Sequence, residues 1–279
     1  MAEAMALTAA VCFGLVHFFS GLLSRRASSY AIALTGQVGG MLLVLIAAPI
    51  AGALDVTVSA LAWGTVSGVG TGIGVTYLYR GISRGRMSVV VPLSDVAAVA
   101  LPVLFGVAIL GDAPTVAGWC GIMVAIPALW LVSRQARPAA TLSATGTMDG
   151  LIAGAGFALQ FIAISRVGPA AGLWPVLAAR VAAAATITPL AMRVRAKLKL
   201  HGRLVAPALV VGSLGSVGIT LYLVATQQHL LALVTVLTAL YPVIPVVLAF
   251  LVLRERPSKA QNFGLACAAA AIALITLGS

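Results

Sequence analysis

Four polar side chains stand inside long apolar stretches of the chain and are the residues best suited to chemistry: Asp95, Arg180, His17 and Gln160. A carboxylate in apolar surroundings can bind an amine or carry a proton, and a guanidinium can bind a carboxylate. The imidazole of His17 exchanges protons near neutral pH. Each residue also has a structural alternative, because Asp95 can pair with a helix end or with Arg180, a long arginine can extend to a polar boundary, and a histidine can simply pack.

Aromatic and hydroxyl side chains in the same stretches are further candidates for a binding site. Tyr79, Tyr222 and Tyr241 can line a cavity, with packing or interface anchoring as the alternative for each. Thr238 takes the place of Asp95 in the second half of the chain, 143 residues later. We expect these four side chains to belong to the site that Asp95 would form.

Four prolines divide two of the apolar stretches. Pro92 and Pro102 lie in one, and Pro242 and Pro245 lie in another. Proline lacks a backbone donor and interrupts the i→i−4 hydrogen bonds of a helix. The freed carbonyls can bind a ligand, or the segment can act as a hinge. We predict hinges at these positions, with a static kink as the alternative.

The composition indicates that all of these residues are held within a membrane. Apolar residues make up 61% of the 279 and charged residues only 8%, whereas about a quarter of a soluble domain is charged. A soluble enzyme, a nucleic-acid binder and a disordered protein are therefore excluded, and a polytopic membrane protein is predicted. Ten spans are predicted, over residues 4–23, 30–53, 59–80, 88–110, 115–133, 146–165, 172–191, 204–225, 231–253 and 260–277.

Basic residues are concentrated in alternate connections between the ten predicted spans. Fifteen lysines and arginines fall on one side, Arg166 alone falls on the other, and Arg180 is left inside a span. Cytoplasmic loops are enriched in basic residues. We therefore predict that the basic side is cytoplasmic and that both termini lie outside, in a cell membrane, with the bacterial inner membrane as the favoured location.

The chain contains an internal repeat at an offset of 143 residues. This shift places Tyr79 on Tyr222, Pro102 on Pro245, Asp112 on Glu255 and Gly121 on Gly264, and it also relates Gln37 to Arg180. The pattern predicts a first five-helix repeat over 1–133, a connector over 134–145 and a second repeat over 146–279. Because five is odd, the second repeat must be inserted upside down. The predicted fold is thus an all-α membrane protein of ten transmembrane helices in two inverted repeats.

Several short motifs add to this plan: Phe13-Gly14, the Arg-Gly-Arg-Met-Ser stretch of 84–88, and the acidic-x-Pro turns at 111–114 and 254–257. With them the chain resembles the EamA-type branch of the drug/metabolite transporter superfamily over nearly its whole length. The first repeat departs from that pattern in having Asp112 where glutamate is commoner. The resemblance implies a ten-helix carrier whose central cavity is lined mainly by the first, third and fourth helices of each repeat. It also implies that the fifth and tenth helices pack outside.

The function that we expect is secondary active transport of small metabolites such as amino acids, by alternating access and in the export direction. An amino-acid-like solute offers an amine to Asp95 and a carboxylate to Arg180, and proton coupling at Asp95 is left open. A hydrophobic-cation or drug exporter would need only Asp95. A lipid-linked-sugar flippase and a non-transporting membrane scaffold are the remaining alternatives.

The heights of the two charges in the membrane fit a solute between them. Asp95 lies about two turns from the cytoplasmic end of its span, and Arg180 about two turns from the outer end of its own. Each is then about 10 Å deep, which leaves about 10 Å between their levels in a core of about 30 Å. A direct ion pair is not expected. During transport we expect helices 1–4 to rock against helices 6–9.

Catalysis is not expected from this sequence. An intramembrane aspartyl protease needs two buried aspartates, and we expect Asp95 to be the only buried one. A zinc protease needs a His-Glu-x-x-His helix, which His17, His201 and His229 do not form. We expect no metal and no cofactor. The expected partners are a small solute and the lipid bilayer but no nucleic acid, and the oligomeric state is left open.

Overall fold

A computed structural model describes residues 1–84, 87–133, 144–253 and 258–277, and the regular structure of these residues is entirely helical. The first half contains α1 (Ala2–Ser24), α2 (Ser29–Ala51), α3 (Val58–Arg84), α4 (Met87–Phe105), the π-helical turn η1 (Gly106–Leu110) and α5 (Val116–Ser133). The second half contains α6 (Ala144–Ser165), the 3₁₀ turn η2 (Pro169–Ala171), α7 (Trp174–Arg193), α8 (Gly202–Thr226), α9 (Leu231–Ala239), α10 (Val243–Leu253) and α11 (Lys259–Leu277).

The ten predicted spans all correspond to helices. In the described part of the chain nine helical segments are long and apolar enough to cross a membrane, and α5 adds a shorter apolar helix over Val116–Val132. This confirms the predicted fold class. Most of the predicted connector and the turn at 254–257 fall on residues 134–143 and 254–257, which lie outside the described residues.

The ninth span is broken into two helices. α9 ends at Ala239 and α10 begins at Val243, because Pro242 has no backbone N–H with which to continue the helical ladder. The neighbouring N–H groups of Tyr241 and Val243 instead bond to carbonyls three residues back, at 3.3 and 3.1 Å. Shifted by 143 residues, Pro242 falls on Val99, where α4 continues unbroken. The break therefore belongs to the second repeat alone.

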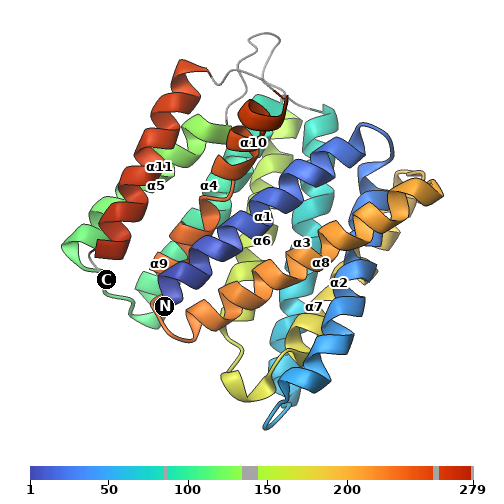
Figure 1. The fold of residues 1–279 in the computed structure, drawn as a ribbon, viewed down its shortest axis with the longest axis horizontal. Helices are drawn as coiled ribbons and strands as arrows, with labels where there is room; N and C mark the ends of the chain where they lie inside the picture. Colours follow the sequence, from blue (N-terminus) through green and yellow to red (C-terminus); the bar gives the residue numbers. More distant parts are fainter. Residues whose placement is uncertain (85–86, 134–143, 254–257, 278–279) are drawn as a thin grey trace.

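The helices form a closed ring around the centre of the protein (Figure 1). α4 packs on α6, α6 on α3, α3 on α7, α7 on α2, α2 on α8, α8 on α1, α1 on α9 and α10, and α9 on α4. Helices α5 and α11 pack on each other outside this ring. The position of α5 and α11 is the one that the family resemblance implies.

Glycines allow the closest approaches between helices of different repeats. A Cβ at Gly64 or Gly68 on α3 would lie 2.2 or 2.1 Å from a carbonyl oxygen of α7. On α8 a Cβ at Gly212 would lie 1.8 Å from the carbonyl oxygen of Gly36 on α2. Small residues bring membrane helices together in this way because lipid offers no hydrophobic driving force for their association. The glycine repeats of α2 and α3 are thus packing surfaces.

The ring divides into two bundles, each built from both repeats. One, the α1 bundle, contains α1, α2, α8, α9 and α10, and the other, the α3 bundle, contains α3, α4, α6 and α7, as the packing within each indicates. The 143-residue shift maps α1 on α6, α2 on α7, α3 on α8 and α4 on the α9–α10 pair, so it exchanges the two bundles. The bundles meet along two seams, α2 with α7 and α4 with α9. Each seam joins repeat-related helices, so both lie on the pseudo-two-fold axis.

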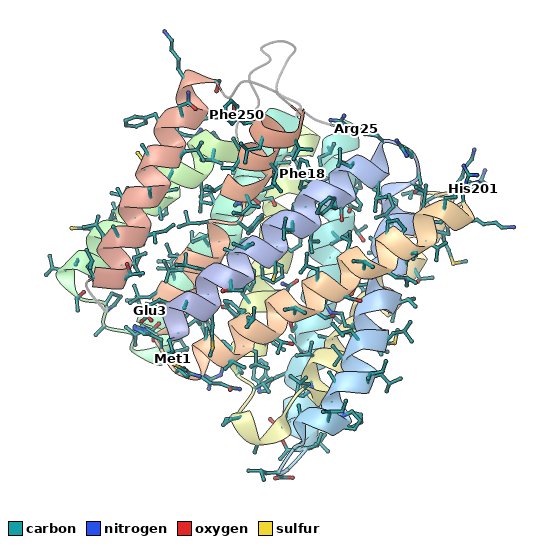
Figure 2. All side chains as sticks on the ribbon, viewed as in Figure 1. Met1, Glu3, Phe18, Arg25, His201 and Phe250 are labelled. Carbon is teal, nitrogen blue, oxygen red and sulfur yellow. The ribbon has the colours of Figure 1, made fainter. Side chains whose placement is uncertain are left out.

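The two ends of the protein differ in charge and in the position of the termini. Both termini lie at the same end, as an even number of spans requires (Figure 1). Figure 2 shows Arg25 and His201 at the opposite end from Met1 and Glu3. The end that carries Arg25 is called the basic end below, and the other is called the terminal end.

Candidate functional site

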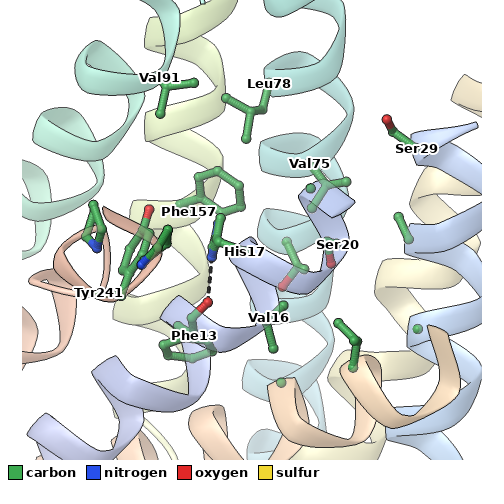
Figure 3. Close-up of a pocket in the computed structure, with 18 of the residues that line it drawn as sticks. Phe13, Val16, His17, Ser20, Ser29, Val75, Leu78, Val91, Phe157 and Tyr241 are labelled. Carbon is green, nitrogen blue, oxygen red and sulfur yellow. Dashed lines mark hydrogen bonds between the residues drawn. The ribbon is translucent and has the colours of Figure 1, made fainter. Parts of the chain in front are cut away.

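The ring encloses a cavity of about 770 Å³ that is lined by both bundles. Its lining reaches Ser24 and Ser29, beside the loop of Arg25 at the basic end, and stops at Phe13 and Phe161 in the middle of the protein. Most of the lining side chains are apolar, as the close-up in Figure 3 shows. The cavity therefore occupies the half of the protein toward the basic end.

Aromatic packing closes the cavity on the side of the terminal end. The rings of Phe13 and Phe161 meet edge to face with centroids 6.1 Å apart, and Phe161 packs on Tyr222 at 4.8 Å. Tyr222 is fully buried, and its hydroxyl lies 2.8 Å from the Thr235 hydroxyl in a hydrogen bond. These contacts join α1, α6, α8 and α9 into a floor.

Polar contacts hold the terminal end together below this floor. The carboxylate of Asp112 accepts a hydrogen bond of 2.8 Å from the backbone N–H of Ala232, in the first turn of α9. His229 Nε2 lies 3.1 Å from a carboxylate oxygen of Glu3 on α1. The first contact joins the segment that follows α4 and η1 to α9, and the second lies within the α1 bundle, between α1 and the α8–α9 connection.

The seam between α4 and α9 carries an acidic cluster of Asp95, Tyr241 and His17. The Tyr241 hydroxyl donates to Asp95, whose residue is 5% exposed, at 2.5 Å. The His17 ring stacks on the Tyr241 ring with centroids 4.6 Å apart (Figure 3). His17 Nδ1 must donate to the Phe13 carbonyl oxygen, 2.7 Å away, since a carbonyl only accepts. Neutral His17 therefore keeps Nε2 as an acceptor that a proton can occupy.

The opposite seam, between α2 and α7, carries a cation. Arg180 donates to the Gln37 side-chain oxygen at 3.3 Å and to the Gly215 carbonyl oxygen at 2.9 Å. Its Nε is buried and has no acceptor among the described residues. The ion pairs of the described residues do not include Arg180. A guanidinium inside a membrane is costly, and the groups that accept its hydrogen bonds among the described residues are neutral.

A polar contact between α3 and α6 lies on the wall that joins the two seams. Thr71 donates to the Gln160 side-chain oxygen at 2.6 Å, and Ser67 donates to the Gln160 carbonyl at 2.9 Å. The Gln160 residue is 8% exposed and lines the cavity together with Thr71. These bonds fix the position of an amide that a solute in the cavity can reach.

Most of the predicted site residues come together at this cavity. The lining includes Asp95, Arg180, His17, Gln160, Tyr79, Tyr241, Pro242 and Pro245. Tyr222 and Pro102 are outside the lining, as is Thr238, which is fully buried and donates to the Ala6 carbonyl oxygen. The side chain of Pro92 lies outside the described part of the structure. Asp95 and Arg180 face the cavity without a mutual ion pair.

The sequence reasoning left several polar lining residues out of the site. Gln37 could have been identified from the sequence, because it is the repeat partner of Arg180 at an offset of 143 residues. In the structure the two side chains contact each other on the symmetry axis. No sequence feature marks Thr71 as a site residue, since a threonine in an apolar helix usually forms a hydrogen bond with its own backbone. The lining also takes five residues from α2, the second helix of its repeat, which the family resemblance did not imply.

Comparisons with known proteins place the fold. A solved crystal structure, described only as "Crystal structure of protein", superposes with a TM-score of 0.76 at 19% identity, over 99% of this chain and 96% of that chain. No curated protein matches the sequence. The sequence model of the EamA-like transporter family matches twice, over residues 1–134 and 144–277. With nearly the whole chain in those two matches, the protein is a member of the EamA-like transporter family, a membrane transporter of the drug/metabolite transporter superfamily.

Proposed function

We propose that this transporter exports amino-acid-like zwitterions by alternating access. The observation that carries the proposal is the distribution of charge in the cavity. The Asp95 carboxylate lies at one seam, and the Arg180 guanidinium, which has no acidic partner in the described part of the chain, lies at the other. A solute with an amine and a carboxylate satisfies both ends. A solute with one charge leaves the opposite charge unpaired in a site of low polarity, which is unfavourable.

The size and lining of the cavity support a small amphipathic solute. A volume of about 770 Å³ is within the range of about 300–1,000 Å³ that is typical of small-molecule sites. Apolar and aromatic walls, among them Val75, Leu78 and Phe157, suit an apolar side chain. Gln160 is placed to orient the polar end of the solute.

Proton coupling is proposed for the acidic cluster. Asp95 accepts from Tyr241, and His17 stacks on the same ring with Nε2 available. A proton that enters the cavity can therefore bind at either of two neighbouring groups. Displacement of the solute amine by a proton at Asp95 would connect export to a proton gradient.

A transport assay tests the proposed function. Proteoliposomes that contain the purified protein are loaded with a mixture of amino acids, amines and carboxylic acids, and efflux is followed by mass spectrometry with and without an imposed proton gradient. We expect zwitterions to leave at least tenfold faster than from protein-free liposomes. Selective efflux of hydrophobic amines would instead indicate a cation exporter. Efflux of none of the three classes would overturn the proposal and return attention to a lipid-linked-sugar flippase or a scaffold.

The packing favours the α1 and α3 bundles as the moving units, in place of helices 1–4 against 6–9. Each bundle is held together by the tight contacts between repeats, whereas the cavity and the two seams lie between the bundles. Rocking about the pseudo-two-fold axis would open the terminal end and close the basic end. The α9–α10 break at Pro242 and the proline at Pro245 are proposed as hinges, and so are Pro102, the repeat partner of Pro245, and Pro92 in α4.

A disulfide within one bundle distinguishes these two motions. A Cβ at Gly218 on α8 would lie 3.2 Å from the Cβ of Cys12 on α1, close enough for Gly218→Cys to form a disulfide with Cys12 after small shifts. The bond would join the two repeats but stay inside the α1 bundle. In a background without Cys120 and Cys267, we expect oxidation to leave the transport rate within about twofold. Loss of transport on oxidation, with full recovery on reduction and no effect in a Cys12→Ala control, would favour repeats that rock as units.

The orientation in the membrane is proposed from the basic end. With that end cytoplasmic, the cavity of this conformation faces the cytoplasm, the side from which an exporter loads. An alkaline phosphatase fused after Ser279 is expected to be active, because phosphatase folds only outside the cytoplasm. Activity only from a cytoplasmic reporter at that position would reverse the orientation and would make this conformation outward-facing.

A further inference from the structure

The turn after η1 places a carboxylate against the first turn of α9. Gly111 ends the π-helical turn in a left-handed conformation with a φ of 75°, which glycine adopts without strain. The chain thereby folds back, and the backbone N–H of Asp112 donates to the Gly106 carbonyl oxygen at 2.9 Å. Because η1 directly continues α4, Asp112 is fixed to the end of α4, a helix of the α3 bundle.

Gly106 leaves room for this carboxylate to reach α9. A Cβ built at Gly106 would lie 2.6 Å from Asp112 Oδ2 and 3.4 Å from the backbone nitrogen of Ala232. Asp112 Oδ2 accepts a hydrogen bond of 2.8 Å from that N–H, and the first N–H groups of a helix have no partner within the helix itself. A negative charge is also favourable there, because the helix dipole is positive at this end. Asp112 therefore caps α9, a helix of the α1 bundle.

This cap lies on the seam between α4 and α9, at the closed end of the protein. Toward the basic end the cavity lies between the same two spans, with Val91 and Asp95 of α4 and Val246 of α10 in its lining. Toward the terminal end Ala232 is fully buried, and the bond from its N–H to Asp112 crosses the seam. Rocking of the bundles that opens the terminal end would move η1 away from α9 and break this bond.

We propose that Asp112 is a positioning residue of the transport cycle, which holds the terminal end closed while the cavity is open at the basic end. In the closed state the carboxylate and the Ala232 N–H satisfy each other. In the open state water reaches both groups and replaces the bond. Loss of the carboxylate therefore destabilises the closed state, where the N–H is left unsatisfied, and has little effect on the open one. The inference rests on the alternating access of the proposed function but not on its solute.

Thiol accessibility measures how often the terminal end opens, and it requires no solute. Ser20 on α1 lines the cavity, whereas its repeat partner Ala163, two residues before the end of α6, is fully buried. In the opposite state the pseudo-symmetry would place Ala163 in the cavity. The reporter is Ala163→Cys in a background without Cys12, Cys120 and Cys267. Its rate of reaction with a charged maleimide is followed on the purified protein in detergent.

Asp112→Ala is expected to raise the reaction rate of the Ala163→Cys reporter about tenfold, because it removes a hydrogen bond to a charged group. Asp112→Asn keeps an acceptor but no charge, so an increase of about threefold is expected. Thr115→Ala is the matched control from the same turn. The Thr115 hydroxyl accepts from the Gly118 N–H at 3.1 Å and so caps α5, and its loss should change the rate by less than about twofold.

A second reporter separates opening of the terminal end from a general loosening of the helices. Ala128 on α5 is fully buried and lies outside the lining of the cavity, so Ala128→Cys should stay unreactive in every variant.

The outcomes separate the role of Asp112 from the proposed function. An unchanged rate in Asp112→Ala would overturn the role, and if that variant does not fold, an unchanged rate in Asp112→Asn would overturn it alone. An equal increase at Ala128→Cys would also overturn it. Faster reaction confined to Ala163→Cys, in a protein that exports no zwitterion, would keep the role of Asp112 and remove the proposed solute.

Discussion

Replacing Asp95 with Asn is expected to lower gradient-driven transport about 100-fold while leaving the amount of folded protein unchanged. Asn has nearly the same shape and keeps an acceptor for the Tyr241 hydroxyl, which donates to Asp95 at the α4–α9 seam. It cannot carry a negative charge or exchange a proton. Hydrogen bonds to charged groups contribute about 1.5–3 kcal/mol, so the loss of the bond to a solute amine alone costs about 10- to 150-fold in rate. The initial rate of uptake or efflux in proteoliposomes, with and without a protonophore, measures the effect.

Two matched variants separate charge from packing in this prediction. Tyr241→Phe removes the hydroxyl that donates to Asp95 but keeps the ring that stacks on His17, so we expect a smaller loss of about tenfold. Asp55→Asn, at an exposed residue between α2 and α3, should have no effect. Normal transport by Asp95→Asn that still responds to the gradient would end both the amine-binding role and the proton role of Asp95.

The spans and the acidic residue could be predicted from the sequence because both depend on local pattern. A run of about 20 apolar residues is sufficient to indicate a membrane helix. Within such a run a charge is costly enough to be noticed, which is how Asp95 and Arg180 were found. The break at Pro242 was not predicted as such, because Pro102 carried the same hinge prediction and lies inside α4, which continues to Phe105.

The order of the helices around the ring could not be predicted in the same way. It depends on which helices approach most closely, and those contacts join residues such as Gly36 and Gly212, far apart in sequence. Inverted repeats also suggest that the five helices of each half pack together as one unit. The packing instead exchanges helices between the halves, so each bundle takes members from both repeats.

Tyr79 and Tyr222 illustrate a limit of reasoning from the repeat. Both were expected in the site as aromatic side chains of apolar stretches, and they occupy equivalent positions, yet Tyr79 lines the cavity and Tyr222 is fully buried below it. A carrier that is open at one end breaks its own two-fold symmetry, so equivalent residues have different surroundings in any single state. If transport opens the terminal end and closes the basic end, Tyr222 would line the cavity of the opposite state and Tyr79 would be buried.

The salt bridge between Arg80 and Asp149 was also missed. Arg80 was counted among the loop residues because the third span was expected to end there, but α3 continues to Arg84. Asp149 lies in the second turn of α6 and is 2% exposed, so the expectation that Asp95 is the only buried aspartate is wrong. Arg80 donates to both of its carboxylate oxygens, at 3.0 and 2.5 Å, and lies 4.1 Å over the ring of Tyr77. The pair joins α3 to α6, the central contact of the α3 bundle.

Replacing Arg80 with Gln is therefore expected to be the most destabilising single change of a charged residue in the α3 bundle. It leaves the Asp149 carboxylate buried without its cation, and the loss of one partner of a buried pair costs about 3–5 kcal/mol. The Arg80 side chain is 31% exposed, so we expect the lower part of this range and a decrease in Tm of about 5–10 °C in detergent. Differential scanning fluorimetry of the purified variants measures the decrease.

The double variant Arg80→Gln/Asp149→Asn decides whether the unpaired Asp149 carboxylate causes the loss of stability in Arg80→Gln. Asn in place of Asp149 removes the buried charge, so most of the lost stability should return, although the bidentate geometry is gone. Arg80→Lys keeps the charge but cannot form two parallel bonds, and its Tm should lie between those of the original protein and Arg80→Gln. Arg166→Gln, which removes an exposed arginine, should leave Tm unchanged. A double variant no more stable than Arg80→Gln would show instead that the arginine acts through its contact with Tyr77.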